Sequence, residues 1–128
     1  MNTFSAFSGK VIHGLKIGRT IGFPTMNIDV SEGSIPSDGA YVVQVKINTE
    51  QYLGIMSIGN RPTLVEKGNK SVEIHLLDIN KDCYGLFVDV IPLVFIRPNE
   101  KFNSIEALKS RIEKDKVFAL GLYSLRQP

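Results

Sequence analysis

The sequence of 128 residues has a single cysteine, Cys83, and no tryptophan. One cysteine excludes a disulfide within the chain, and no cluster of metal-ligating residues surrounds it. Proteins without disulfides are typical of reducing compartments, so we expect a cytoplasmic protein. The first seven residues also lack the basic and apolar blocks of a signal peptide.

An excess of charge and a long apolar run are lacking too. Fifteen Lys and Arg against thirteen Asp and Glu give a net charge of +2, which does not favour nucleic acid as a partner. The most apolar stretch, 88–96, contains Asp89 and Pro92 and is too short to span a membrane. We expect one domain over residues 1–128, with its core at about 8–120.

Alternating apolar and polar residues, the pattern of half-buried strands, fill much of the chain. The segment 41–47 alternates in this way, a polar turn follows at 48–50, and the segment 51–58 then predicts a β-hairpin. The apolar run 86–96 predicts a further strand. Pro92 inside this run predicts an edge strand or a bulge, because proline cannot donate to a sheet ladder.

Only the end of the chain has a helical pattern. Asn103 or Ser104 can cap the helix. Apolar residues recur on one stripe, at Ile105, Leu108, Ile112 and Ala119. Several antiparallel strands and one amphipathic helix predict a mainly β fold, a small barrel with the C-terminal helix packed on it.

A glycine-rich segment precedes the predicted strands. Gly14, Gly18 and Gly22 are spaced by four residues, with Lys16 and Arg19 between them. Such a backbone can approach a ligand closely, and backbone N–H groups beside cations suit a polyphosphate. The spacing differs from a Walker P-loop, and by itself it favours an ordinary surface turn.

Directly after the glycines comes the sequence Phe23-Pro24-Thr25-Met26-Asn27. Pro24 restricts the backbone, and Thr25 and Asn27 would point to one side of an extended chain. Their hydroxyl and amide oxygens are ligands that suit Mg²⁺. On spacing alone, a strand start with a polar outer face is the simpler interpretation.

A strand is also predicted around Val72, Ile74 and Leu76, which leaves Glu73 and His75 on the opposite face. In a closed barrel that face borders solvent, a partner, or a cleft under the helix. A carboxylate in a cleft could accept a proton from an attacking hydroxyl. On the strand pattern alone, a solvated Glu73 beside a hydrogen-bonded or exposed His75 is the favoured interpretation.

The loop 96–102 joins the last predicted strand to the helix. Phe102 could cover a planar ligand. The position of Phe102 just before Asn103 favours the other interpretation, a hydrophobic staple that precedes the helix cap.

Taken in this order, these segments resemble the riboflavin kinase family. The resemblance covers roughly residues 8–119 and rests on three motifs together, with shorter matches between them. The motifs are G-F-P-T-x-N at 22–27, E-x-H-L-x-D at 73–78 and R-P-x-x-x-F at 97–102. Met26 stands where the family often has alanine, and we expect its side chain to point away from the metal.

The resemblance implies a six-stranded antiparallel Greek-key barrel with a C-terminal helix. It also implies Mg²⁺-dependent transfer of the ATP γ-phosphate to riboflavin, giving FMN and ADP. The implied nucleotide-binding residues are Lys16, Gly18, Arg19, Thr20, Gly22, Pro24, Thr25 and Asn27. Thr25 and Asn27 are implied to hold Mg²⁺, and Glu73 is implied to be the catalytic base. The implied flavin-binding residues are Arg97, Glu100, Phe102 and Leu108.

Bacterial members of this family usually carry a second, N-terminal module that adenylylates FMN. The sequence has no H-x-G-H motif for such a module, so we expect a single-function kinase or the kinase part of a longer protein. A flavin- or RNA-binding regulator is an alternative, although the low charge disfavours RNA and the retained Thr25, Asn27 and Glu73 favour an enzyme. A small β-barrel adaptor that binds a protein is the other alternative.

Overall fold

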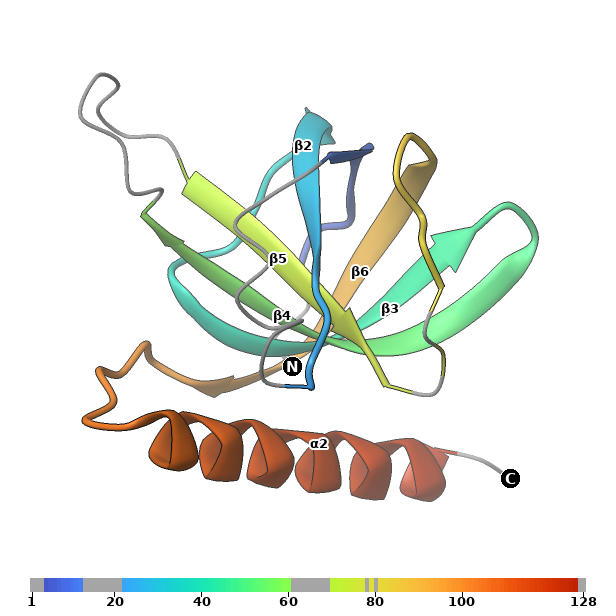
Figure 1. Cartoon of the computed structure of the whole chain (residues 1–128). Coiled ribbons are helices and arrows are strands. Elements are labelled where there is room, and N and C mark those ends of the chain that lie inside the picture. The colour runs from blue at the N-terminus through green and yellow to red at the C-terminus, as the bar shows by residue number, and fades with distance from the viewer. Residues whose placement is uncertain (1–3, 13–21, 61–69, 78, 80, 127–128) are drawn as a thin grey trace.

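In the computed structural model of the chain, the described residues form six strands that close into a barrel, with a long helix beneath it (Figure 1). The structure describes residues 4–12, 22–60, 70–77, 79 and 81–126, and only the backbone of 123–126. The elements are β1 Phe7–Ile12, β2 Met26–Gly33, β3 Gly39–Ile47, β4 Glu50–Asn60, β5 Lys70–Leu76, β6 Phe87–Arg97 and α2 Ile105–Arg126.

The order of the strands around the barrel is β1-β2-β5-β4-β3-β6. All neighbouring strands are antiparallel. β3, β4 and β5 follow one another, and β6 returns to lie beside β3, which is the Greek-key arrangement. The barrel and the C-terminal helix are therefore confirmed.

The predicted hairpin is formed by β3 and β4, which pair from Gly39 with Ile58 to Ile47 with Glu50. The turn is shorter than expected because Glu50 already belongs to β4. Asn48 has a φ of 57°, a left-handed conformation that asparagine adopts more readily than most side chains.

Pro92 marks a bulge, as one of the two interpretations of the sequence predicted. The register between β3 and β6 shifts where Val42 pairs with Val94 and Val43 pairs with Pro92. As a whole β6 is not an edge strand, because it pairs with both β3 and β1, but at Pro92 its ladder partner is β3 alone. β1 pairs with β6 only as far as Val90, so Pro92 lies beyond that ladder.

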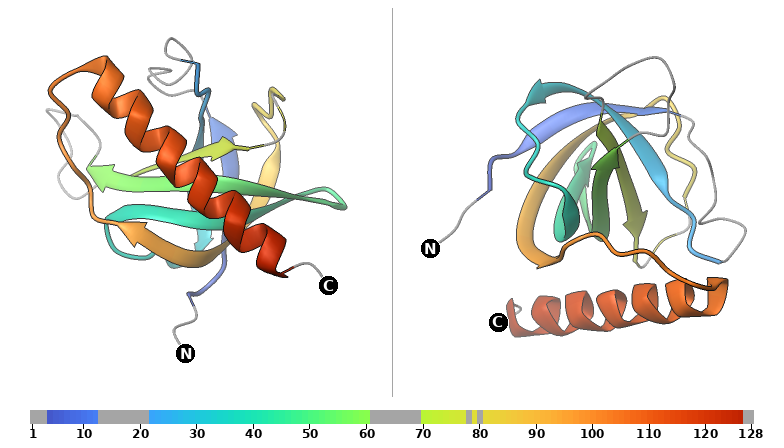
Figure 2. Two further views of the ribbon diagram at one scale, coloured as in Figure 1. Left: turned by 90° about the horizontal axis from the view of Figure 1, so that it is seen from below. Right: turned by 90° about the vertical axis from the view of Figure 1, so that its left-hand side faces the viewer.

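Apolar side chains pack in two separate clusters. The first fills the barrel and includes Tyr41, Val43, Val45 and Ile47 of β3, the inward face that the alternation predicts. The second lies between the outside of the barrel and α2, with Val42, Ile55, Leu77 and Ala119 buried together. Figure 2 shows α2 crossing β3, β4 and β6 on the outside of the barrel. One outer face of the barrel is thus covered by the helix.

The helix begins where the sequence predicts, and Ser104 is its cap. The backbone N–H of Ala107 donates to Ser104 Oγ at 3.1 Å. The predicted stripe holds at Ala119, which is buried, but Ile105 is 59% exposed, so its place in the stripe is wrong. Ile105 is the first residue of the helix, at the edge of the stripe. Asp115, which was not predicted to belong to the stripe, is 1% exposed and is buried like Ala119 one turn later.

Candidate active site

The sheet register places polar residues side by side on the outer face of the barrel. Asn27 of β2 pairs with Glu73 of β5, and Ser57 of β4 pairs with Glu73 from the other side. The neighbours of Glu73, Val72 and Ile74, are buried in the barrel core, so Glu73 points outward. Of the three environments considered for this face, the cleft under the helix is the one found.

That cleft is a pocket of about 280 Å³ between the barrel, the loop after β6 and the first half of α2. This volume is near the lower end of the range for small-molecule sites, roughly 300–1,000 Å³. Its lining residues are Phe23, Thr25, Ala40, Ile55, Ser57, Glu73, His75, Arg97, Asn99, Glu100, Phe102, Leu108 and Ile112. The pocket therefore joins segments that are far apart in the sequence.

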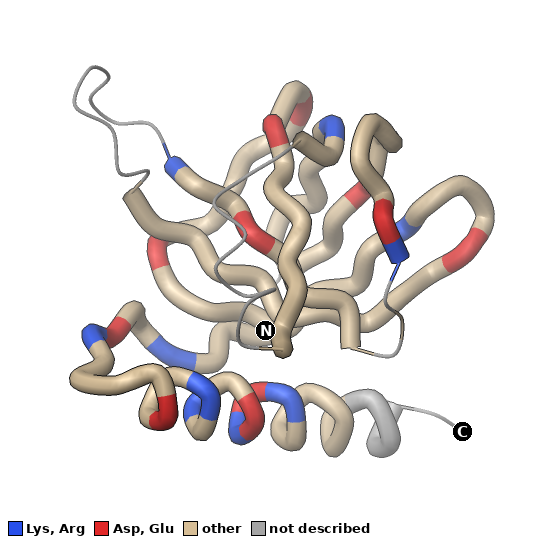
Figure 3. Tube along the Cα trace, viewed as in Figure 1, with Lys and Arg blue, Asp and Glu red and all other residues tan. Residues whose placement is uncertain are grey.

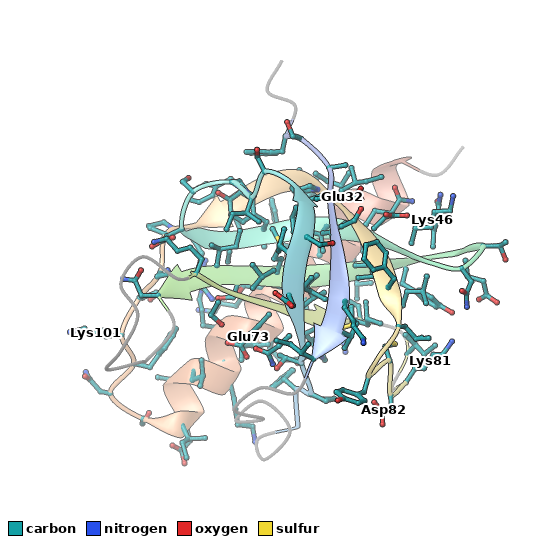
Figure 4. All side chains as sticks on the ribbon, turned by 90° about the horizontal axis from the view of Figure 1, so that it is seen from above. Glu32, Lys46, Glu73, Lys81, Asp82 and Lys101 are labelled. Atoms are coloured by element: carbon teal, nitrogen blue, oxygen red, sulfur yellow. The ribbon has the colours of Figure 1, made fainter. Side chains whose placement is uncertain are left out.

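Thr25 and Glu73 are in direct contact in this pocket. Thr25 Oγ1 donates to Glu73 Oε1 at 3.2 Å (Glu73 is labelled in Figure 4). Asn27, 8% exposed, is the direct cross-strand neighbour of Glu73. The fold thus brings together the three residues that the resemblance implied for metal binding and base catalysis.

His75 lies next to this group and touches the segment before β2. The His75 ring nitrogen Nδ1 lies 2.7 Å from the carbonyl oxygen of Pro24, to which it donates. The rings of Phe23 and His75 meet edge to face, with centroids 5.5 Å apart. The sequence left open whether His75 is hydrogen-bonded or exposed, and in the structure it is hydrogen-bonded.

A network of charges attaches the loop after β6 to α2. Arg97 Nη2 lies 2.8 Å from Asp115 Oδ2, and Arg97 Nε donates to both carboxylate oxygens at 3.2 Å. Glu100 lies 3.7 Å from Arg97 and 3.4 Å from Arg111. Figure 3 shows both charge signs along this loop and the first half of α2. Among the helix residues whose side chains the structure describes, charge is therefore concentrated at the pocket end.

Most predicted site residues of the described segments lie at the pocket. Thr25, Glu73, Arg97, Glu100, Phe102 and Leu108 line it. Asn27 is beside Glu73, Pro24 is held by His75, and Gly22 has a φ of 91° in the segment leading to Phe23. The predictions for Lys16, Gly18, Arg19 and Thr20, and the motif residue Asp78, lie outside the described residues.

Asn99, His75 and Asp115 were not assigned a role from the sequence. Asn99 Nδ2 donates to the carbonyl oxygen of Ile58 at 2.9 Å, which attaches the loop to β4. A carboxylate on the apolar stripe of the helix was the feature that could have revealed Asp115. The contacts of Asn99 and His75 join residues 41 and 51 positions apart, which no local pattern shows.

The oxygen atoms at the pocket suit a hard cation. The hydroxyl of Thr25, the amide of Asn27 and the carboxylate of Glu73 are neighbours, and Mg²⁺ prefers such ligands, with phosphates and water completing its shell. Within the described ranges, no group of three or more His, Cys, Asp or Glu residues could hold a metal ion. The oxygens of Thr25, Asn27 and Glu73 fit Mg²⁺ that is bound together with a phosphate.

Comparison with known proteins relates this geometry to a family. The family model described as riboflavin kinase matches residues 2–122. The bifunctional riboflavin kinase/FMN adenylyltransferase of Bacillus subtilis is 43% identical over 119 residues, which are 91% of this chain and 38% of that protein. The Escherichia coli protein of the same name is 40% identical over 124 residues, 96% of this chain and 39% of that protein. The chain thus spans less than half the length of these relatives.

Two solved structures share the fold of this chain. The riboflavin kinase of Trypanosoma brucei superimposes with a TM-score of 0.64 at 25% identity, covering 98% of this chain and 85% of that one. A macrolide-efflux protein from Streptococcus pneumoniae gives a TM-score of 0.82 at 35% identity, over 89% of this chain and 38% of that one. In the part of this chain that the structure describes, no helix is long and apolar enough to cross a membrane. The match over residues 2–122 shows that the chain belongs to the riboflavin kinase family.

Proposed function

We propose that the chain is a riboflavin kinase that transfers the γ-phosphate of ATP to the 5′-hydroxyl of riboflavin. The observation that supports this most directly is the composition of one pocket. A carboxylate, Glu73, and a hydroxyl, Thr25, lie on its barrel side, and Phe102 and Leu108 lie on its helix side. A phosphoryl-transfer site needs polar groups next to an apolar space for the flavin, and this pocket offers both.

Glu73 orients the riboflavin hydroxyl and accepts its proton as the new bond forms. The hydroxyl oxygen bonds to the γ-phosphorus, the bond from that phosphorus to the β–γ bridging oxygen breaks, and ADP leaves. Phosphoryl transfer depends chiefly on such positioning and on neutralised charge. Thr25 and Asn27, the neighbours of Glu73, would hold Mg²⁺, which when bound neutralises charge on the phosphates.

The nucleotide lies on the Thr25 side of the pocket. Gly22, Pro24, Thr25 and Asn27 contribute to its binding, together with Lys16, Gly18, Arg19 and Thr20 of the glycine-rich segment. Backbone N–H groups and cations in such a segment suit the phosphates.

The flavin lies between the barrel and α2. Arg97, Glu100, Phe102 and Leu108 enclose the isoalloxazine ring. Their positions are fixed by the contact of Arg97 with Asp115 and by the packing of α2 on the barrel. A pocket lined by apolar groups with a few polar ones is typical of sites for such ligands.

Two further proposals concern the setting of the reaction. The chain acts in the cytoplasm, in keeping with a free and buried Cys83. Its product FMN is passed to an FMN adenylyltransferase, an activity that the names of the Bacillus subtilis and Escherichia coli relatives combine with riboflavin kinase.

The test is to incubate the purified chain with riboflavin, ATP and Mg²⁺ and to separate FMN and ADP by chromatography. Glu73→Gln should lower turnover by about 10²–10⁴-fold, the usual contribution of a general base, while the fold is retained. Glu32→Gln, at the exposed far end of β2, is the matched control and should turn over as the wild type does. Omission of Mg²⁺ should abolish FMN formation. The absence of FMN from the wild type would refute the proposal, and wild-type turnover by Glu73→Gln would refute the role of the base.

A further inference from the structure

The backbone ladder between β2 and β5 stops just short of Thr25. Its pairs are Asn27 with Glu73 and Met26 with Ile74, so the next pair in this register would join Thr25 to His75. β2 begins at Met26, and Thr25 lies outside the ladder. The backbone of Thr25 is therefore not fixed by sheet hydrogen bonds to β5.

A side chain makes the connection at this point. His75 Nδ1 donates to the carbonyl oxygen of Pro24 over 2.7 Å, although the two residues are 51 positions apart. Because a carbonyl oxygen can only accept, the hydrogen bond requires the proton on Nδ1 and so sets the tautomer of the ring. Pro24 itself has no N–H group to offer β5.

This hydrogen bond acts directly on Thr25. The carbonyl group of Pro24 and the N–Cα bond of Thr25 belong to one planar peptide unit, so an anchor on the Pro24 oxygen fixes the plane from which Thr25 starts. The φ of Pro24 is restricted by its ring, which removes a second degree of freedom. From this plane the Thr25 hydroxyl reaches Glu73 at 3.2 Å.

We propose that His75 is a positioning residue, which holds the Pro24–Thr25 peptide so that the Thr25 hydroxyl faces the phosphates of the nucleotide. The inference rests on the proposed kinase function, because it assigns Thr25 to the bound Mg-nucleotide. The other interpretation of His75 is packing alone, through the edge contact of its ring with Phe23.

Two amide variants separate these interpretations. In His75→Asn the amide nitrogen is as many bonds from the backbone as Nδ1 and can donate to the Pro24 oxygen. In His75→Gln the nitrogen is one bond further away. Both variants lose the ring and its contact with Phe23, so a difference between them reports on the hydrogen bond.

The measurements are the affinity for MgADP by calorimetry and the KM for MgATP in FMN formation, with thermal unfolding to check the fold. We expect His75→Gln to weaken MgADP binding and to raise the KM for MgATP by about tenfold. We expect His75→Asn to stay within about threefold of the wild type in both values. The two variants should unfold at similar temperatures.

Equal losses in the two variants would overturn the inference in favour of packing by the ring. Wild-type values in both variants would overturn it too, because neither the hydrogen bond nor the ring would then matter for nucleotide binding. If the wild type binds MgADP with this dependence on residue 75 but forms no FMN, the kinase proposal fails and the positioning role stands. If the wild type forms FMN and His75→Gln has the same MgADP affinity and KM, the kinase proposal stands and the positioning role fails. A wild type that does not bind MgADP would overturn the positioning role, because Thr25 would have no nucleotide to face.

Discussion

Arg97 at the end of β6 and the buried Asp115 in the middle of α2 form an ion pair, with Nη2 and Oδ2 2.8 Å apart. Asp115 is 1% exposed, and Arg97 also lines the pocket. The contact that attaches the helix to the barrel therefore also fixes one wall of the candidate active site.

Asp115→Ala should destabilise the protein strongly. Breaking a buried ion pair typically costs about 3–5 kcal/mol, and the effect here should lie at or below that range because Glu100 remains 3.7 Å from Arg97. Arg97 would lose three hydrogen bonds, and Arg111 would lose the carboxylate 3.4 Å from its Nε. The free energy of unfolding in urea measures the effect.

The matched control is Glu113→Ala, an acidic residue on the exposed side of the same helix. It should change the free energy of unfolding by no more than about 0.5 kcal/mol. A free energy of unfolding for Asp115→Ala equal to that of the control would show that the ion pair does not hold the helix.

Much of the fold could be predicted because its causes are local. The alternation from Tyr41 to Ile47 specifies one inward face, and the polar turn after it specifies a hairpin. Ser104 caps the helix through a contact three residues away. Ile105 was misplaced because helical periodicity gives the stripe but not the residue at which the helix first meets the barrel.

The candidate site was predicted in part, and the reason is the length scale of its contacts. Glu73 could be placed opposite the core residues Val72 and Ile74 by alternation alone. That its face borders a cleft depends on where α2 packs, which alternation does not reveal. Asn27 faces Glu73 only through the pairing of β2 with β5, two strands separated in the chain by β3 and β4.

Phe102→Ala should weaken riboflavin binding by about tenfold or more and leave MgADP binding unchanged. Phe102 lines the pocket beside Leu108, and the loss of a partly buried aromatic side chain removes apolar contact with the ring. Quenching of riboflavin fluorescence measures the dissociation constant. Phe118→Ala is the control, because Phe118 lies on α2 and is 44% exposed. Riboflavin affinity equal to that of the control would place the flavin elsewhere.

Thr25→Val should remove the Mg²⁺ dependence of nucleotide binding. Valine is close to threonine in size and shape but lacks the hydroxyl, which here donates to Glu73 and is proposed to hold Mg²⁺. Calorimetry with ADP should therefore give nearly the same affinity with and without Mg²⁺ in this variant, whereas the wild type should bind MgADP more tightly than ADP. Thr49→Val, in the exposed turn between β3 and β4, should behave as the wild type does. A Thr25→Val protein that still binds MgADP more tightly than ADP would assign the metal to other oxygens. Asn27, already proposed as a ligand, and Glu73 would then be the candidates, because they face each other across β2 and β5.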